Sequence, residues 1–424
     1  MIGNYGKKKI IHCNLLGAYM ANAFNPGAVV VIHTPRSCSH ILAGTLPLFQ
    51  DRYRVHQKAL PYNTHNLYVT GLSSKDAIFG GEQKLKDCLL AVARLRKPEY
   101  IMVAAGCVAG VIGDDVASIC KTVENITGIP IFPLPGSGFM NNQAVDPIIE
   151  STKYLLNRFV DFTAKEEKKP WAAVLGNNAI LTSMADLEEL TRLYKYFGFE
   201  KVLFPPAGMS VAELKSLKLV SLLAAGGMVI RNHKSITGYT GYLANKMHIP
   251  CISLDIPCTP GETYAYLESI GKTLHKPDVA AAAVHMEKEQ VDKQLAGYAR
   301  ILKNRKIILA FSMPLRFMRP HNLIAMLQAC KLVLQGFLLL PELGEVETEK
   351  YKLALHDYGL PFYTESGYLA AKPADTFVIT VAPKEYFEKQ FCISIRRIGT
   401  RGTVNLWHRL AEFVTADRSI AYEE

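Results

Sequence analysis

Short apolar runs alternate along the chain with longer stretches in which apolar residues recur every three or four positions. The short runs are typical of buried strands, and the longer stretches are typical of amphipathic helices. Strand-like runs include "GAVVVIHTP", "EYIMVAAG", "WAAVLGN", "CISLDIP" and "RKIILAFS". Strands that alternate with helices favour parallel, doubly wound sheets. The pattern therefore predicts an α/β fold.

One local construction occurs three times, around Pro130, Pro250 and Pro361. A predicted helix is followed by Gly or His, an apolar residue, proline and an apolar strand. The Gly or His can end the helix in a left-handed conformation, and the proline prevents the helix from continuing. The three prolines are separated by about one domain length, roughly 100–150 residues. We therefore predict three Rossmann-like domains with mainly parallel sheets, over residues 1–168, 169–270 and 271–424, the last with a C-terminal arm.

Composition narrows the class of protein. The 424 residues are 49% hydrophobic and 20% charged, as in ordinary globular proteins. We find neither a convincing membrane span nor a secretion-type apolar segment near the first residues, so a cytoplasmic protein without a membrane partner is expected. The net charge of +10 comes from dispersed basic residues without interleaved aromatics, which predicts an acidic protein partner and no nucleic acid.

Three of the nine cysteines share a position relative to the predicted elements. Cys13, Cys38 and Cys107 each lie at the carboxyl side of an apolar strand and near the start of a helix. Backbone N–H groups and the helix dipole stabilise a thiolate there, and thiolate is the form that binds iron. A cubane iron–sulfur cluster usually takes four cysteines, so three from one chain would leave the fourth to a partner.

A different interpretation is that the cysteines are small buried apolar residues. We expect this for the cysteines inside helical or strand patterns, which are Cys88, Cys120, Cys330 and Cys392. Spacing alone leaves the same interpretation open for Cys13, Cys38 and Cys107, because none of them forms a CxxC pair. The chain also has neither a GxGxxG after a strand nor a GxxxxGK[ST], so it is not expected to bind a dinucleotide or hydrolyse ATP by those routes.

Four segments in order, "CNLLGA", "HTPRSCSH", "DAIFGGEQKL" and "CVAGVIGDDV", resemble the nitrogenase component 1 superfamily. That superfamily includes the nitrogenase molybdenum–iron protein subunits, a cofactor-assembly scaffold and nitrogenase-like reductases. The resemblance covers most of the chain and is sharpest over residues 10–145. It implies that Cys13, Cys38 and Cys107 bind an iron–sulfur cluster, [4Fe-4S] or a larger P-cluster-like form, at a subunit interface. Asp114 and Asp115 are then expected to cap and orient the following helix.

The chain departs from the catalytic members of that superfamily in two places. Asn232 occupies the position of a cofactor-binding cysteine, and the last domain lacks the corresponding histidine. A second metal cofactor would therefore not be bound through the usual cysteine and histidine. The resemblance implies a homologous or identical component 1 subunit, in a dimer or tetramer, and a separate ATP-dependent iron–sulfur reductase as electron donor.

Three roles within the superfamily stay open: half of a nitrogenase-like reductase, a beta-type partner that carries half of the cluster, and a non-catalytic assembly scaffold. We favour the first or second over the scaffold. A small-molecule-binding α/β protein without a cluster is the alternative from another class.

Several polar residues at predicted strand ends or in glycine-rich loops could line a pocket near the cluster, although each could equally be a solvated loop residue. They are His40, Arg52, Arg54, Asn141, Asn142, Gln143, Asn232 and His233. In "SMPLRFMRPHNL", Arg316, Arg319 and His321 could bind an anionic group. A rigid proline-framed turn is the simpler interpretation of that segment.

Overall fold

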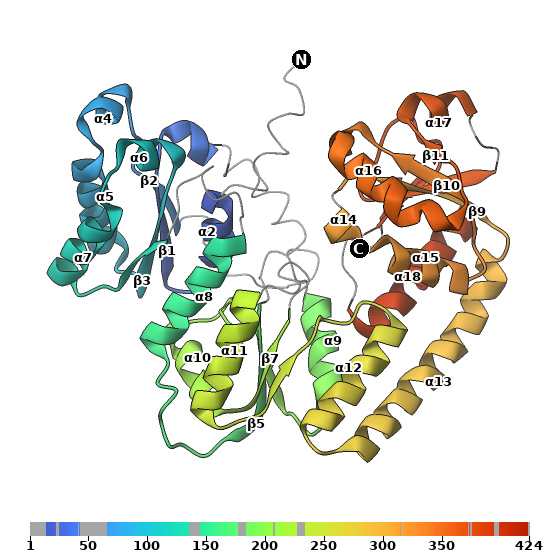
Figure 1. Ribbon diagram of the computed structural model, residues 1–424, viewed down its shortest axis with the longest axis horizontal. Coiled ribbons are helices and arrows are strands. Elements are labelled where there is room, and N and C mark those ends of the chain that lie inside the picture. The colour runs from blue at the N-terminus through green and yellow to red at the C-terminus, as the bar shows by residue number, and fades with distance from the viewer. Residues whose placement is uncertain are drawn as a thin grey trace. The chain divides into compact units, whose positions relative to one another are not determined.

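The computed structural model describes twelve stretches of the chain, shown in Figure 1: residues 14–22, 25–40, 42, 66–134, 145–176, 184–206, 208–226, 234–313, 315–371, 373, 375–393 and 398–422. Contacts divide the chain into two compact units. The first comprises Met1–Leu187 with Gly198–Asp255, and the second comprises Glu188–Phe197 with Ile256–Glu424.

The first sheet of the first unit has the strand order β2-β1-β3-β4, and all its pairings are parallel. Its strands are β1 (Ala28–His33), β2 (Leu67–Val69), β3 (Tyr100–Ala105) and β4 (Ile131–Leu134). Alternate residues of β1 serve opposite faces, as the pleat of a strand requires. Val29 and Val31 share a core with α5 (Glu82–Arg96) and α7 (Val116–Thr127). Val30 and Ile32 share the other core with α2 (Asn14–Asn22) and α8 (Val145–Phe159).

The second sheet of the same unit has the order β6-β5-β7-β8, again entirely parallel. Its strands are β5 (Lys169–Leu175), β6 (Lys201–Leu203), β7 (Val220–Ala225) and β8 (Cys251–Ser253), with helices α10 (Val211–Lys215) and α11 (Lys234–Met247). Leu175 and Leu223 of this sheet belong to the same hydrophobic core as Val30 of the first sheet. The two sheets of this unit are therefore joined by one continuous core.

The second unit contains a six-stranded parallel sheet of order β11-β10-β9-β12-β13-β14. The strands are β9 (Lys306–Phe311), β10 (Val333–Leu339), β11 (Phe362–Tyr363), β12 (Thr376–Thr380), β13 (Gln390–Cys392) and β14 (Ile420–Tyr422). Trp407 is fully buried in the larger core of this unit and donates a hydrogen bond from Nε1 to Met326 O at 2.9 Å.

The second unit contains the helices α12 (Pro260–Thr273), α13 (Pro277–Leu302), α14 (Leu315–Met318), α15 (Pro320–Ala329), α16 (Gly344–Leu355), α17 (Glu365–Ala371) and α18 (Gly399–Thr415). Most of helix α9 (Met184–Lys195) also belongs to this unit. In the described residues, no helix is both long and apolar enough to cross a membrane.

The three repeated constructions are present as predicted, one in each sheet. Pro130, Pro250 and Pro361 stand directly before β4, β8 and β11. The residues that end the preceding helices have positive φ, at 70° for Gly128, 53° for His248 and 63° for Gly359. The predicted α/β class with parallel sheets is therefore confirmed. The exact limits of the three domains stay a prediction.

Candidate functional site

Two of the three predicted cluster ligands follow neighbouring strands of the first sheet. β1 and β3 pair in parallel with His33 opposite Ala105, so their carboxyl ends lie side by side. Cys107 is the first residue of α6 (Cys107–Ile112), and Cys38 lies in the helical residues 36–40 that follow β1. Both side chains are half-buried. We call this region, where β1 and β3 end and Cys38 and Cys107 follow, the cysteine edge.

Close packing of two backbones shapes the cysteine edge. The N–H of Gly106 donates to His33 O at 2.9 Å, which joins the ends of the two strands. A Cβ on Gly106 would lie 2.4 Å from Oγ1 of Thr34, so only glycine fits here without a shift. Thr34 is fully buried, and its Oγ1 has no hydrogen-bond partner among the described residues.

A buried polar network fixes the loops around these strand ends. Nε2 of His33 lies 2.9 Å from Oδ2 of Asp114, and the two side chains are 0% and 2% exposed. The carboxylate of Asp114 also accepts hydrogen bonds from Gly81 N, at 3.0 and 3.2 Å. Nδ1 of His33 lies 2.9 Å from Oγ1 of Thr70, which accepts a hydrogen bond from Thr34 N at 3.2 Å. Burial lowers the pKa of His33 below 6.5, although Asp114 acts in the opposite direction.

The expectation that Asp114 and Asp115 both cap the following helix is half right. Asp115 is the N-cap of α7, and its side chain accepts a hydrogen bond from Ser118 N at 3.0 Å. Asp114 instead binds His33 and the backbone of Gly81, the N-cap of α5. Neighbouring side chains point apart at this position, so the two carboxylates serve different helices.

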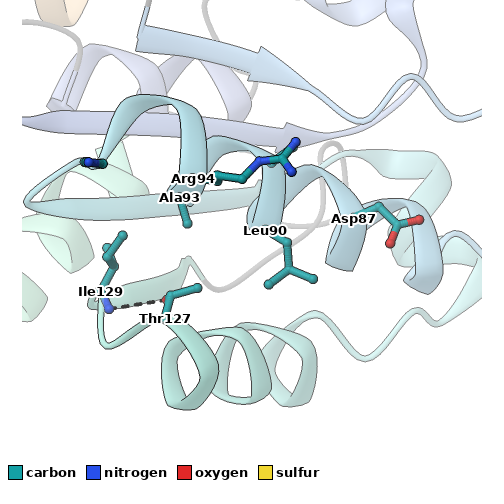
Figure 2. Close-up of a pocket in the computed structure, with 8 residues that line it drawn as sticks. Asp87, Leu90, Ala93, Arg94, Thr127 and Ile129 are labelled. Atoms are coloured by element: carbon teal, nitrogen blue, oxygen red, sulfur yellow. Dashed lines mark hydrogen bonds between the residues drawn. The ribbon is translucent and has the colours of Figure 1, made fainter.

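A cavity of about 620 Å³ lies at the opposite end of the first sheet, between the last turn of α5 and the end of α7. Figure 2 shows its lining side chains, which come from Asp87, Leu90, Ala91, Ala93, Arg94, Lys97, Thr127 and Ile129. Lys97 and Ile129 precede β3 and β4, so the cavity lies at the amino ends of the strands. Ligands of parallel sheets bind at the carboxyl ends, and the cysteine edge is therefore the better candidate site.

Comparison with known proteins decides the family. A family model described as "Nitrogenase component 1 type Oxidoreductase" matches residues 13–328. The chain belongs to this family. It is 25% identical over 319 residues to the nitrogenase iron-molybdenum cofactor biosynthesis protein NifE of Clostridium pasteurianum, a match that covers 72% of this chain and 62% of the relative. A nitrogenase molybdenum-iron protein alpha chain of Methanosarcina barkeri is 22% identical over 281 residues, covering 65% of this chain and 50% of the relative.

The chain thus spans less than two thirds of the length of either relative. A NifE protein of Methanococcus maripaludis is matched over 38% of its length. A solved structure titled "Nitrogenase Cp1 at pH 5" shares the fold, with a TM-score of 0.63 and 18% sequence identity over 96% of this chain and 88% of that chain. The resemblance to the nitrogenase component 1 superfamily is therefore confirmed.

The remaining predicted site residues of this nitrogenase component 1-type chain are only partly described. His40 is exposed at the end of the helical residues 36–40. Eight residues lie outside the described part of the chain: Cys13, Arg52, Arg54, Asn141, Asn142, Gln143, Asn232 and His233. Among the described residues, no group of three or more His, Cys, Asp or Glu side chains is arranged to hold a metal ion. Because Cys13 is not among them, the predicted three-cysteine set stays a prediction.

The structure describes all four cysteines that we expect to be small buried apolar residues. Cys120, Cys330 and Cys392 are buried, and Cys88 is half-buried. Burial raises the pKa of Cys120 and of Cys330 to about 12, and that of Cys88 and of Cys392 to about 11. These four side chains are therefore protonated thiols at neutral pH, which is the form that binds metal poorly.

The arginine segment before α15 is a structural turn. Nη1 of Arg319 lies 3.2 Å from Oε2 of Glu262, and Asn322 Nδ2 donates to Oε1 of the same carboxylate at 2.8 Å. Nδ1 of His321 lies 3.1 Å from the hydroxyl of Tyr358. Because Glu262 already neutralises Arg319, these contacts support the simpler interpretation over an anion site.

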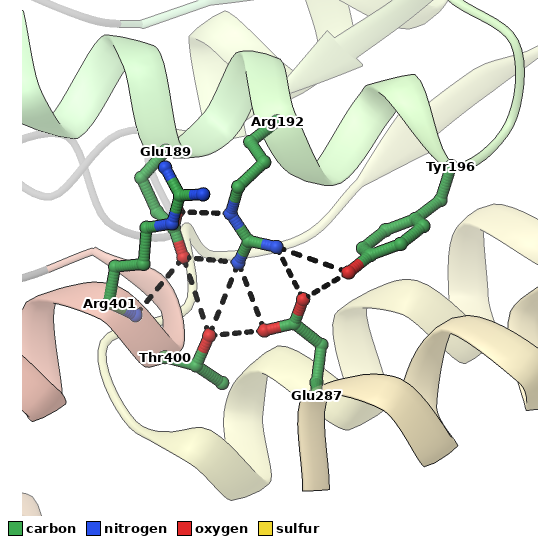
Figure 3. A network of polar contacts seen from close by, with 6 residues as sticks. All are labelled: Glu189, Arg192, Tyr196, Glu287, Thr400 and Arg401. Atoms are coloured by element: carbon green, nitrogen blue, oxygen red, sulfur yellow. Dashed lines mark hydrogen bonds and ion pairs between the residues drawn. The ribbon is translucent and has the colours of Figure 1, made fainter. Parts of the chain in front are cut away.

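Sequence reasoning missed one buried charged cluster in the second unit, which Figure 3 shows. Arg192 lies between two buried carboxylates: its Nε donates to Glu189 at 2.7 Å and its Nη2 donates to Glu287 at 2.9 Å. Thr400 donates its hydroxyl proton to Glu287, and the N–H of Arg401 donates to Glu189 at 3.2 Å. Burial would raise the pKa of Glu287, but hydrogen bonds from Arg192 and Thr400 hold it below its ordinary value.

The members of this cluster are far apart in sequence, with 95 residues between Arg192 and Glu287 and 212 between Glu189 and Arg401. No local sequence pattern predicts such a pairing. The cluster joins α9, α13 and α18 through buried hydrogen bonds and ion pairs, and we call it the structural clamp.

Proposed function

We propose that this chain is a component 1-type subunit that binds an iron–sulfur cluster at a subunit boundary through Cys13, Cys38 and Cys107. One observation carries the proposal: Cys38 and Cys107 follow adjacent parallel strands, at the carboxyl ends where ligands of such sheets bind. Cys107 is the first residue of α6, two residues after the end of β3.

The donor set fits such a cluster. Thiolates are its usual ligands, and a half-buried position leaves Cys38 and Cys107 accessible to iron and to a partner. A bound cluster, cubane or larger P-cluster-like, would supply one-electron transfer. The chain's own part is to supply the sulfur ligands and to hold their loops through the His33–Asp114 pair. A homologous or identical subunit, in a dimer or tetramer in the cytoplasm, would complete the ligand set.

An exposed apolar patch beside the cysteine edge supports docking of a separate ATP-dependent iron–sulfur reductase. Ile78 and Phe79 at the end of α4 (Ser74–Phe79) are 75% and 78% exposed, and Val111 of α6 is 82% exposed. Helices α4 and α6 are in contact. Exposed apolar residues that gather on one surface mark interaction sites. Because α6 begins at Cys107, a donor bound here would approach the cluster ligands.

Phe79→Ser tests the docking surface. We expect weaker association with the reductase and lower turnover at unchanged iron content. The matched control is Leu353→Ser, which removes a side chain 83% exposed on α16 and should leave association unchanged. Equal effects of the two variants would contradict the assignment of this patch.

The chemical role that we favour is one half of an oxidoreductase, which passes electrons from the reductase to a substrate or to a second metal site. Asn232 stands where the resemblance predicts a cofactor-binding cysteine, so a second metal cofactor would require other ligands. A non-catalytic assembly scaffold is the second candidate. The similarity to NifE proteins, whose name describes cofactor biosynthesis, favours it specifically.

Anaerobic purification followed by iron and sulfide analysis and EPR spectroscopy tests the cluster. We expect Cys38→Ala and Cys107→Ala to lose most of the iron, whereas Cys120→Ala and Cys330→Ala should retain it. A wild-type protein that stays free of iron in an iron-replete preparation would overturn the proposal. Turnover with an ATP-driven reductant would then distinguish the oxidoreductase from the scaffold, which would instead transfer its bound metal to an acceptor apoprotein.

A further inference from the structure

We propose that the hydroxyl of Thr34 donates a hydrogen bond to sulfur at the cysteine edge and thereby raises the reduction potential of the cluster. The acceptor is a cysteine thiolate or an inorganic sulfide of the cluster. This inference rests on the proposed function, because it needs an electron-rich sulfur next to Thr34.

Both backbone polar groups of Thr34 are hydrogen-bonded, so only its hydroxyl lacks a partner among the described residues. Its N–H donates to Oγ1 of Thr70 at 3.2 Å, and its carbonyl oxygen accepts from Gly71 N and Leu72 N, both at 3.1 Å. The residue is 0% exposed, and Oγ1 has no hydrogen-bond partner in the described part of the chain. Buried hydroxyls are normally paired, and an unpaired one destabilises the fold.

The position of the hydroxyl points to the missing acceptor. Oγ1 of Thr34 would lie 2.4 Å from a Cβ built on Gly106, so it packs against the residue directly before Cys107. Thr34 also precedes Cys38 by four residues, and Cys38 lies in the helical turn of residues 36–40. The hydroxyl thus lies where the two backbones that carry the predicted ligands approach each other.

The expected consequence is electrostatic. Reduction adds negative charge to an iron–sulfur cluster, and a hydrogen bond to sulfur stabilises the reduced form more than the oxidised form. Hydrogen bonds to the sulfurs are one of the means by which proteins set cluster potentials. Losing the hydroxyl should therefore move the midpoint potential to a more negative value.

Thr34→Val and Thr34→Ser separate the hydroxyl from the shape of the side chain. Valine keeps the shape without the donor, whereas serine keeps the donor. The first readout is the EPR-monitored midpoint potential of the anaerobically purified cluster. We expect a negative shift in Thr34→Val and a potential close to wild type in Thr34→Ser. An unchanged potential in Thr34→Val with full iron content would overturn the inference.

The second readout is the denaturation midpoint of the metal-free protein. Without a cluster the hydroxyl has no acceptor among the described residues, so Thr34→Val should raise this midpoint. The control is Thr152→Val in α8, because the buried hydroxyl of Thr152 already donates to Ile148 O at 2.8 Å. It should lower the denaturation midpoint without shifting the potential.

A lower denaturation midpoint in Thr34→Val would show that the hydroxyl has a protein partner, and would overturn the inference. If the wild-type protein binds no iron, the proposed function fails first. That result is distinct from a bound cluster whose potential does not respond to Thr34→Val.

Discussion

Asp114→Asn tests the polar network that holds the cysteine edge, because it replaces a carboxylate by an amide of nearly the same shape. The side chain of Asp114 is 2% exposed and lies 2.9 Å from His33 Nε2 and 3.0 Å from Gly81 N. The carboxylate of Asp114 can only accept a hydrogen bond from Nε2, which leaves Nδ1 of the neutral ring to accept from the hydroxyl of Thr70. The ring proton of His33 is therefore on Nε2 and is donated to Asp114.

Asparagine cannot satisfy both neighbours of Asp114. If its oxygen keeps the hydrogen bond from Gly81 N, its NH₂ group faces the N–H of His33, and two donors oppose each other. If His33 moves its proton to Nδ1, the hydroxyl of Thr70 loses its acceptor. Either way one hydrogen bond of the network is lost and no charged acceptor remains, which costs about 1.5–3 kcal/mol, as for a hydrogen bond to a charged group. That free energy corresponds to roughly a 10- to 150-fold faster amide exchange.

Hydrogen–deuterium exchange of β1 and β3 is the suitable assay, because a chain with two compact units need not unfold in two states. We expect faster exchange of both strands in Asp114→Asn. The matched control is Asp115→Asn, in which asparagine is an equally good helix cap. It should change the opening free energy by less than about 0.5 kcal/mol. Equal exchange in the two variants would refute the His33–Asp114 pairing.

Two further predictions concern buried charge. Arg192→Met removes the counter-charge of Glu287, which is 0% exposed, and leaves Glu189, which is 3% exposed, with only Arg401 at 3.7 Å. Breaking a buried ion pair costs about 3–5 kcal/mol, so amide exchange of α13 should accelerate, whereas Arg401→Met, at a side chain 61% exposed, should cost less than about 1 kcal/mol. Equal losses would contradict the clamp. Because burial lowers the pKa of His33 below 6.5, the unfolded chain binds more protons than the folded chain between the two pKa values. The stability of β1 should therefore be complete above pH 6.5 and fall as the pH decreases toward the lowered pKa. His33→Gln should remove that slope in exchange measurements, and an unchanged slope would assign it to another group.

Local chemistry explains how much of the fold could be predicted. Glycine or histidine, then an apolar residue and proline, end a helix and begin a strand by their own backbone preferences, and all three such sites have that role. The continuous core of the first two sheets could not be predicted, because it depends on contacts between distant parts of the chain; Val30 and Leu223, for example, belong to the same core. No local residue preference encodes such a contact.

The same distinction applies to the site. The positions of Cys38 and Cys107 after strands could be predicted, because each depends on the residues just before it. The role of Asp114 could not, since its partner His33 lies 81 residues away and the sequence presents Asp114 and Asp115 as equivalent neighbours. The hydroxyl of Thr34, which has no partner among the described residues, could not be predicted either, because Gly106, which packs against it, follows the adjacent strand β3.

Two cysteines in consecutive helices differ in burial, and therefore in their ability to bind iron. Cys107 begins α6 at the edge of the sheet, whereas Cys120 of α7 packs with Val31 in the core. Burial raises the pKa of Cys120 to about 12, so its side chain is a protonated thiol at pH 7. Iron binding to Cys120 would require the free energy of that deprotonation and the opening of the core as well. A metal should therefore bind at the cysteine edge even in Cys120→Ala, and iron lost equally from Cys120→Ala and Cys107→Ala would mean that overall folding, not ligation, determines the iron content.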